Sequence, residues 1–488
     1  MLSSISFILD GNIVSLDFDG PSRIRPTTTV LNYLRSLPTH RGVKEGCAEG
    51  DCGACTVVLG ELGTDGTLRY RSVDSCLVFL PMIHGKQLIT VENLKSSNGH
   101  LHPVQGAMVE TGGSQCGFCT PGIIMSLFAL FKNSNHPSRA DVDDALTGNL
   151  CRCTGYKPII EAAAKACVHN GVDGLTDSEP HVIELLKTIP FGHLALKTTA
   201  QQYLRPATLT EALALKHRYP GATVMCGATD VALRVTKQNE LMPLIIDLSA
   251  VDELKIVHDD DKSMTIGSAV TFSELTPRIK DCFGALYDMI AVFGSQQIRN
   301  LATLGGNLGT ASPIGDSLPV LMAYNARVVL QNASSAREVP LDSFFKGYRQ
   351  TDRRADELIT SVIIPRVQDG VYVKSYKISK RKDLDISTLS GGFRLRVNEH
   401  TNDVETITLV YGGMADVVKH ARTTEQFLLG KKWERGVIEQ AMLLLSNDLS
   451  PISDTRGGAQ FRRIAARNLL LKFWSETVAG EKEHTAVE

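Results

Sequence analysis

Long apolar runs and a strong net charge are both missing from this sequence. No stretch of eighteen consecutive apolar residues occurs, so we expect no membrane-spanning helix. The first residues lack a basic region followed by a long apolar core, so we expect no secretion signal. The formal net charge of −2 disfavours a nucleic acid or an anionic membrane held by bulk electrostatics. We therefore expect a cytoplasmic protein whose partners are small molecules or other proteins.

Two common nucleotide-binding motifs are also missing. Neither Gly-x-Gly-x-x-Gly nor Gly-x4-Gly-Lys-Ser/Thr occurs, which disfavours both a Rossmann dinucleotide site and a P-loop. The composition, 43% apolar and 21% charged, is that of a folded chain rather than a disordered one. A length of 488 residues indicates about three domains with sizeable cores.

Cysteine, by contrast, is clustered. Eight of the eleven cysteines stand in tight groups, and in a reducing compartment this usage favours cofactor ligation over disulfides. Cys47, Cys52 and Cys55 follow the order Cys-x4-Cys-x2-Cys, and Cys76 follows after twenty residues. This is the plant-type spacing for a two-iron, two-sulfur cluster. A structural zinc site is the alternative, although zinc ligands usually come as two close pairs.

A second group combines Cys116-x2-Cys119 with Cys151-x-Cys153. The first pair leads, through Pro121, into a dense apolar run that predicts a buried helix. We expect each pair to lie at the end of a helix, so that a second cluster can sit between helix termini. A lone Cys-x-x-Cys would serve zinc or thiol chemistry equally well. The other cysteines are expected to be ordinary buried thiols: Cys167, Cys226 and Cys282.

The first ninety residues alternate as short strands with one helix. Residues 5–9 and 13–16 predict a hairpin around Asp10-Gly11-Asn12, and residues 29–37 have helical spacing. A strand follows the first cysteine group. This arrangement resembles the β-grasp of plant-type ferredoxins. Residues 171–195 lack periodicity until a short apolar run, and we interpret them as a linker between halves that fold separately.

Two later stretches are suited to phosphate binding. A strand at 223–226 runs into Gly227-Ala-Thr-Asp230, whose consecutive backbone N–H groups suit a pyrophosphate, although a glycine turn after a strand is usually only a turn. The stretch 293–316 adds small residues for close backbone approach, hydroxyl groups and an acid.

Together these motifs resemble the molybdenum hydroxylases, the xanthine dehydrogenase and aldehyde oxidase family, and in particular the separate small subunits of its bacterial xanthine dehydrogenases. All eight cysteine positions match the family pattern. The resemblance implies that the first group holds the cluster near the flavin and the second the cluster near molybdopterin. It also implies that Gln115, by itself an ordinary helix-cap residue, contacts the pterin of another chain, so that its surroundings form a subunit interface.

The same resemblance implies an FAD domain of the vanillyl-alcohol-oxidase type. Its first pyrophosphate loop would be Val224, Met225, Cys226, Gly227, Ala228, Thr229, Asp230 and Val231. Its second would be Thr303, Leu304, Gly305, Gly306 and Asn307. Further flavin contacts would come from Phe293, Asp316, Ile359 and Lys377. Lys377 alone would otherwise be a surface lysine.

Ser138 and Asp141 predict the capping box of a helix over 138–146, and we expect two further helices across 433–447 and 458–474. We therefore expect a multidomain α+β chain. Its parts are a ferredoxin-like β-grasp domain (1–90), a helical [2Fe–2S] domain (91–170), the linker (171–195), the FAD-binding domain (196–365) and a C-terminal α+β cap of the flavoprotein (366–488).

The family resemblance implies an electron-transfer subunit, since nothing in the chain could be the large molybdopterin domain. Hypoxanthine and xanthine would be converted to urate on a molybdopterin-binding large subunit, in a heterodimer that pairs into a heterotetramer. That subunit would also supply the catalytic base. Electrons would pass through two [2Fe–2S] clusters and FAD to NAD.

Other functions stay open. The chain could serve another molybdenum hydroxylase, acting on an aldehyde, nicotinate or an aromatic acyl-CoA, or it could be a stand-alone flavin iron–sulfur reductase or a zinc scaffold. Leu384 stands where animal members of the family have an acid tied to acceptor choice, which leaves NAD and oxygen both possible. Tyr348-Arg349 resembles the nicotinamide-side wall and favours NAD.

Overall fold

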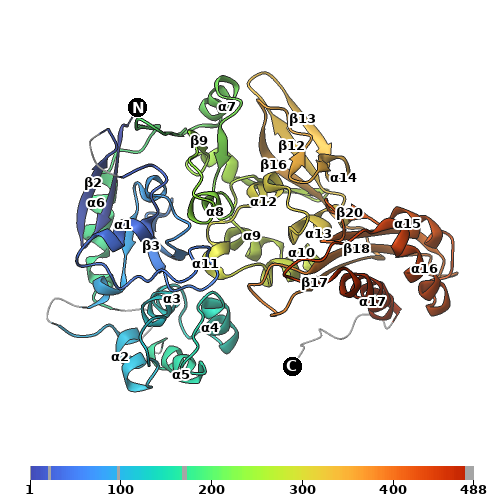
Figure 1. The fold of residues 1–488 in the computed structure, drawn as a ribbon, viewed down its shortest axis with the longest axis horizontal. Helices are drawn as coiled ribbons and strands as arrows, with labels where there is room; N and C mark the ends of the chain where they lie inside the picture. The colour runs from blue at the N-terminus through green and yellow to red at the C-terminus, as the bar shows by residue number, and fades with distance from the viewer. Residues whose placement is uncertain (1, 20–23, 96–98, 168–172, 479–488) are drawn as a thin grey trace. The chain divides into compact units, whose positions relative to one another are not determined.

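The structure, a computed structural model, describes residues 2–19, 24–95, 99–167 and 173–478. These residues form two units (Figure 1). The first unit comprises Met1–Glu253, Thr271–Ser273 and Gly294–Thr303; the second comprises Leu254–Val270, Glu274–Phe293 and Leu304–Glu488. Within the described ranges, no helix combines the length and the apolar character needed to cross a membrane.

The first unit begins with a five-stranded sheet in the order β2-β1-β5-β3-β4. The predicted hairpin is confirmed: β1 and β2 pair from Ser4–Asp17 to Leu9–Asn12, and Asp10 and Gly11 both have positive φ at the turn. The side chain of Thr29 caps the following helix by accepting the N–H of Asn32. These elements are β1 (Ser4–Leu9), β2 (Asn12–Asp17), α1 (Val30–Ser36), β3 (Thr56–Leu62), β4 (Leu68–Asp74) and β5 (Gln87–Ile89).

Four helices follow this sheet. The predicted apolar helix is α3, which is buried along most of its length, and Cys119 stands at its N-cap. The predicted cap of α4 is confirmed, since Asp141 accepts hydrogen bonds from the backbone and the hydroxyl group of Ser138. The helices are α2 (Pro103–Glu110), α3 (Thr120–Asn133), α4 (Arg139–Leu146) and α5 (Lys157–Ala166).

The predicted linker is more ordered than expected. Residues 171 and 172 lie outside the described residues, but α6 (Glu179–Thr188) occupies much of the remainder. Its buried Val182 and Leu186 pack with Ile8 of β1. The short apolar run noted in the sequence of the predicted linker thus lies in this helix, whose apolar face packs on β1.

The next elements share a core with the N-terminal five-stranded sheet. A four-stranded sheet in the order β6-β7-β9-β8 contributes Tyr203, Met225 and Ile245 to the same apolar cluster as Phe7 and Leu34. The iron–sulfur region and the first part of the flavin region therefore form one packed body rather than separately folded halves. The elements are β6 (Leu194–Lys197), β7 (Gln202–Arg205), α7 (Leu209–Arg218), β8 (Thr223–Met225), α8 (Val231–Thr236), β9 (Leu244–Asp247) and, later in the chain, α11 (Gln296–Arg299).

The second unit contains the remainder of the predicted FAD-binding domain, which is thus divided between the two units. A five-stranded sheet runs β10-β11-β16-β12-β13. The strands are β10 (Val257–Asp259), β11 (Ser263–Gly267), β12 (Arg327–Gln331), β13 (Ala336–Pro340), β14 (Phe345–Gly347), β15 (Gln350–Thr351) and β16 (Leu358–Pro365). The helices are α9 (Phe272–Ile279), whose first two residues belong to the first unit, α10 (Gly284–Ala291), α12 (Leu304–Thr310), α13 (Ser317–Ala323) and α14 (Leu341–Phe344).

The second unit ends in an antiparallel sheet, β17-β18-β19-β20, covered by C-terminal helices (Figure 1, red). Gly392 on β18 lies against the backbone of Pro319 in α13, where a Cβ would come within 2.2 Å. The strands are β17 (Val371–Ile378), β18 (Leu389–Val397), β19 (Val404–Gly412) and β20 (Lys419–His420). The helices are α15 (Arg422–Leu428), α16 (Arg435–Asp448) and α17 (Ala459–Val478), the last two close to the predicted bounds.

A histidine joins three elements of this unit. His420 Nε2 lies 2.8 Å from Asp342 Oδ1, and its Nδ1 lies 2.9 Å from Glu425 Oε1. Arg422 also contacts both carboxylates. Burial opposes protonation of His420, but the two hydrogen bonds outweigh burial and raise its pKa from 6.5 to about 9.

We expect this site to make stability pH-dependent. Because the folded pKa is raised, the contribution, on the order of 3 kcal/mol, is fully present below the unfolded pKa of 6.5 and is lost as the pH rises through about 9. In thermal unfolding of the full chain, His420→Gln should lower the melting temperature most below pH 6.5 and little above pH 9. His400→Gln, at an exposed histidine of the same unit, is the control. A difference from wild type that stays constant with pH would contradict this assignment.

Candidate functional site

The first cysteine group lies in the loop between α1 and β3, with its fourth member after β4. The side chains form two hydrogen-bonded pairs, Cys47 with Cys52 and Cys55 with Cys76. The backbone N–H groups of Glu49 and Asp51 also donate to Cys47 Sγ, at 3.4 and 3.2 Å. The hydrogen bond from Cys52, helped by these N–H groups, lowers the pKa of Cys47 to about 6, while burial opposes the shift. The loop therefore favours a thiolate.

Two glycines let this loop close on itself. Gly50 and Gly53 have φ values of +76° and +64°, a region that favours glycine. A Cβ at Gly46 would lie only 2.8 Å from Cys52 Sγ. The backbone of the loop therefore approaches the sulfur atoms more closely than it could if side chains replaced these glycines.

A buried acid stands beside the same group. Asp74 is fully buried, Cys55 Sγ lies 3.7 Å from its Oδ1, and its Oδ2 has no hydrogen-bond partner. Burial, with the nearby Cys47, raises the pKa of Asp74 to about 8. The hydrogen bond with Cys55 is the largest single effect on Cys76, and it lowers the pKa. Burial acts in the opposite direction, and the net result is a raised pKa of Cys76. The buried carboxyl group of Asp74 is therefore part of the surroundings of Cys55 and Cys76.

The second group lies between helix ends, as predicted. Its thiols again form two pairs, Cys116 with Cys153 and Cys119 with Cys151. Cys151 is held from two sides: Tyr156 Oη accepts its N–H at 2.8 Å, and Thr154 Oγ1 lies 3.2 Å from its Sγ. Two pairs of thiols match a core in which each of two irons takes two cysteines, and the donor set therefore fits a [2Fe–2S] cluster.

The second group is also open to solvent. Cys116 and Cys153 are exposed, as is Gln115. Two apolar side chains flank them: Phe118 is 47% exposed and Leu150 39%. By contrast, Cys55 and Cys76 of the first group are buried. The described residues contain no group of three or more His, Cys, Asp or Glu side chains arranged for a single metal ion.

A backbone hydrogen bond connects the two cysteine groups. The N–H of Leu150 donates to the carbonyl oxygen of Cys52 at 3.1 Å, one residue before Cys151. This hydrogen bond joins the two ligand loops directly. Of the remaining cysteines, Cys167 is buried as expected, whereas Cys226 and Cys282 are only half-buried, so the expectation of buried thiols was wrong for these two.

The predicted first flavin loop lies in the first unit, between β8 and α8. Ala228 has a φ of +59°, and a Cβ at Gly227 would lie 1.7 Å from the carbonyl oxygen of Leu301. The loop therefore packs directly on the segment that precedes Thr303. Just after α8, Lys237 Nζ donates to the carbonyl oxygen of Cys47 at 3.0 Å. This bond ties the loop's helix to the first cysteine group.

The predicted second flavin loop is divided between the units, with Thr303 in the first and Leu304–Asn307 in the second. Gly305 packs on Ser268, where a Cβ would lie 2.4 Å from the serine Cβ. Asn307 Oδ1 accepts a hydrogen bond from Ser317 at 2.6 Å, next to Asp316. Each loop therefore has a glycine at which a side chain would collide with a neighbouring segment, so close packing holds the backbone of each loop in place.

Lys377, Asp316 and the residue before Phe293 meet in the second unit. Lys377 Nζ donates to Asp316 Oδ2 at 2.9 Å and to the carbonyl oxygen of Val292 at 2.8 Å. Ser387 donates to the other Asp316 oxygen at 2.6 Å. The side chain of Lys377 is 4% exposed, so it is not a surface lysine. Ile359 is buried as well, with 9% of its surface exposed, and it lies near Gly309 on α12.

A cavity of about 550 Å³ opens beside Lys377. Val292, Lys382 and Lys472 are among its lining residues. Leu384 has a φ of +69° and is 8% exposed. The cavity gives an anionic ligand room and positive charge next to the predicted flavin contacts.

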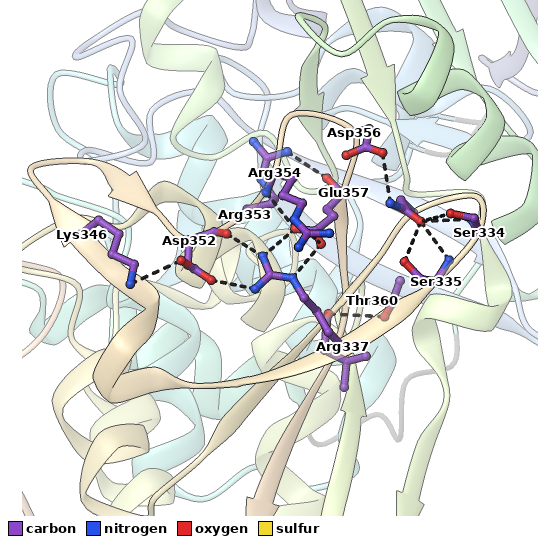
Figure 2. Close-up of polar contacts among 12 residues, drawn as sticks. Ser334, Ser335, Arg337, Lys346, Asp352, Arg353, Arg354, Asp356, Glu357 and Thr360 are labelled. Atoms are coloured by element: carbon purple, nitrogen blue, oxygen red, sulfur yellow. Dashed lines mark hydrogen bonds and ion pairs between the residues drawn. The ribbon is translucent and has the colours of Figure 1, made fainter.

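A network of charges supports the hairpin that carries Tyr348 and Arg349. In Figure 2, Arg337 on β13 points between Asp352 and Glu357, and it binds both oxygens of Glu357 at 2.8 and 2.9 Å. Its third donor bonds Asp352 Oδ2 at 2.7 Å. Tyr348 at the hairpin tip is 62% exposed. This network could not be predicted from the sequence, because Asp352 and Glu357 lie 15 and 20 residues after Arg337.

Comparison with known protein families supports both cofactors. Three family models match the chain: a "[2Fe-2S] binding domain" over residues 90–164, an "FAD binding domain in molybdopterin dehydrogenase" over 197–367, and a "CO dehydrogenase flavoprotein C-terminal domain" over 374–477.

Curated relatives cover nearly the whole chain. A xanthine dehydrogenase/oxidase of Gallus gallus is 32% identical over 543 aligned residues, which cover 96% of this chain and 40% of the relative. A xanthine dehydrogenase of Emericella nidulans is 32% identical over 535 residues, covering 98% and 39%. The chain thus spans about two fifths of the length of these relatives.

Solved structures show the same fold over part of the chain. A Cu,Mo-CO dehydrogenase matches with a TM-score of 0.53 and 21% identity, over 57% of this chain and 97% of that one. A quinoline 2-oxidoreductase from Pseudomonas putida 86 matches with a TM-score of 0.53 and 22% identity, over 58% and 99%.

Proposed function

Because the chain belongs to the molybdenum hydroxylase family and carries its [2Fe–2S] and FAD modules, we propose that it is the electron-transfer subunit of a bacterial xanthine dehydrogenase. Hypoxanthine and xanthine are oxidised to urate on a partner chain that binds molybdopterin. The electrons then pass through this chain to NAD. The observation that carries the proposal is the set of four thiol pairs, joined loop to loop and tied to the first flavin loop.

Each thiol pair holds one iron in this proposal. Cys47/Cys52 and Cys55/Cys76 bind the first cluster, and Cys116/Cys153 and Cys119/Cys151 bind the second. When bound, the clusters carry single electrons, and FAD collects two of them for hydride transfer. The chain's own residues would hold these groups: backbone N–H groups donate to Cys47 Sγ, and Gly227 and Gly305 let the two predicted flavin loops pack closely on Leu301 and Ser268.

The partner chain docks at the second cysteine group in this proposal. The exposed pair Cys116/Cys153 lies between Phe118 and Leu150, two large apolar side chains that are costly to leave in water. Gln115 is exposed beside them and reaches the pterin of the large subunit. The heterodimer pairs into a heterotetramer in the cytoplasm, where the free cysteines of the described residues stay reduced.

NAD is the proposed acceptor. The Arg337 network braces the Tyr348-Arg349 hairpin, and the cavity beside Lys377 offers cationic side chains to an anionic dinucleotide. Leu384 lacks the charge that could repel or steer such a ligand. Oxygen needs neither feature, since it is small and neutral.

An anaerobic absorbance titration of the chain with its native partner tests the proposal. Xanthine is expected to bleach the flavin and iron–sulfur bands, and NAD added afterwards is expected to yield NADH. If NADH bleaches the bands but xanthine does not, the substrate assignment is wrong, and the chain serves another molybdenum hydroxylase, for example one acting on an aldehyde, nicotinate or an aromatic acyl-CoA. A colourless protein containing zinc would overturn the redox function itself.

A further inference from the structure

A buried asparagine stands where the two cysteine groups meet. Asn149 precedes Cys151 by two residues and is 2% exposed. Its Nδ2 donates to the carbonyl oxygen of Gly53 at 3.1 Å and to Thr56 Oγ1 at 3.2 Å. Its Oδ1 accepts from Ser126 Oγ at 2.6 Å and from Gln297 Nε2 at 3.0 Å. The side-chain amide thus uses its full capacity of two donors and two acceptor sites.

The four partners come from separate parts of the first unit. Gly53 lies between Cys52 and Cys55 of the first cysteine group, and Thr56 begins β3. Ser126 belongs to α3, the helix that Cys119 caps. Gln297 belongs to α11, four residues before the Leu301 carbonyl on which the first flavin loop rests. One side chain therefore contacts the surroundings of both cysteine groups and the segment that supports the flavin loop.

The backbone around Asn149 leaves little room for movement. A Cβ at Gly53 would lie 2.4 Å from the carbonyl oxygen of Gly148, and one at Gly122 would lie 2.1 Å from that of Gly53. Gly148 in turn packs on Gln297. The Leu150–Cys52 hydrogen bond lies immediately beside this contact. If the amide of Asn149 were removed, several buried polar groups would lose partners at once, and the two loops would separate.

We propose that Asn149 is a positioning residue that fixes the contact between the two cysteine loops and thereby the rate of electron transfer from one group to the other. The proposal rests on the proposed function, in that each group holds a cluster. Electron tunnelling slows steeply with distance and with the loss of a bonded path. A loop that drifts away from Cys52 therefore slows transfer without removing any cysteine.

The test compares Asn149→Ala with wild type and with Asn133→Ala in the loaded chain. Asn133 is the matched control: its Nδ2 also joins the helical part to the sheet, by donating to the carbonyl oxygen of Tyr70 at 2.6 Å, but away from the cysteines. After mixing with NADH, freeze-quench electron paramagnetic resonance follows the reduction of each cluster. We expect Asn149→Ala to slow reduction of the second cluster about tenfold or more, the size of effect of lost outer-shell contacts at metal sites, with the first cluster unaffected.

A second readout does not depend on turnover. Amide hydrogen exchange at Leu150 should speed up in Asn149→Ala and stay unchanged in Asn133→Ala, because only the first variant frees the Leu150–Cys52 bond. If Asn149→Ala fails to load both clusters, Ser126→Ala decides, since it removes one of the four bonds and should slow transfer by a few-fold.

The possible failures are distinguishable. Wild-type protein without two iron–sulfur signals would overturn the proposed function together with this inference. The role of Asn149 alone would be overturned if wild type shows two normal signals and Asn149→Ala reduces the second cluster at an unchanged rate. Where Asn149→Ala does not load, an unchanged rate in Ser126→Ala has the same meaning. Reduction by NADH but not by xanthine would correct the substrate and leave the positioning role in place.

Discussion

Reduction of the flavin by the hydroxylation substrate is expected to fall by more than about 100-fold when Cys116 is replaced by alanine, because a lost ligand should cost more than the 10- to 100-fold effect of lost outer-shell partners at metal sites. NADH-driven reduction of FAD should survive, since Cys116 belongs to the group farther along the proposed route from FAD. Cys116 is exposed, so the substitution creates no buried cavity. The measurement is anaerobic reduction of the complex from either end, by xanthine and by NADH.

Cys282→Ala is the control for this variant. Its half-buried thiol lies outside both cysteine groups, and it contacts the backbone of Arg278 at 3.4 Å and the side chain of Arg366. Iron analysis should show the loss of one cluster from Cys116→Ala and none from Cys282→Ala. Retained xanthine-to-NAD turnover in Cys116→Ala would disprove the assigned route.

Gly227→Ala is expected to lose most of its FAD. Its new methyl group would lie 1.7 Å from the Leu301 carbonyl oxygen, so the loop or the Leu301 segment must shift. Overpacking of this kind typically costs about 1–3 kcal/mol, which corresponds to a roughly 5- to 150-fold weakening if it falls on FAD binding. The ratio of FAD to iron after desalting measures the effect, because the cysteine groups should remain loaded.

The matched control is Gly221→Ala, just before β8. No atom lies within 4 Å of a Cβ at Gly221, and its φ is not in the positive region, so the methyl group fits. A Gly227→Ala protein with the same FAD content as Gly221→Ala would show that the loop does not approach the cofactor as proposed.

The cysteine spacing predicted two groups of thiols. Within each group the structure brings the thiols into hydrogen-bonded pairs, and this pairing was not predicted from the sequence. The capping box at Ser138 and the hairpin at Asp10 were predicted, because both depend on residues within four positions of each other. The assignment of the cysteines to clusters, and of the loops to FAD, stays a prediction, as do the domain boundaries.

Features that depend on distant contacts were missed. Strand β18 begins with Leu389-Ser-Gly-Gly-Phe393, and two adjacent glycines disfavour a strand interior. The structure explains Gly392, because the backbone of Pro319 packs against it. Helix α6 was not predicted as a helix, because its apolar run is short. Asn149 gave no signal beyond its place next to Cys151, since its four partners lie between 23 and 148 residues away.

The path of the chain between its two units limits how the protein can be cut. The boundaries fall after Glu253, Val270, Ser273, Phe293 and Thr303, so the polypeptide passes from one unit to the other five times. No single break separates the two units. A break after Glu253 leaves segments of the first unit on the C-terminal fragment, and a break after Thr303 leaves segments of the second unit on the N-terminal fragment. A single cut of the gene could therefore not yield the two units as independently expressed parts.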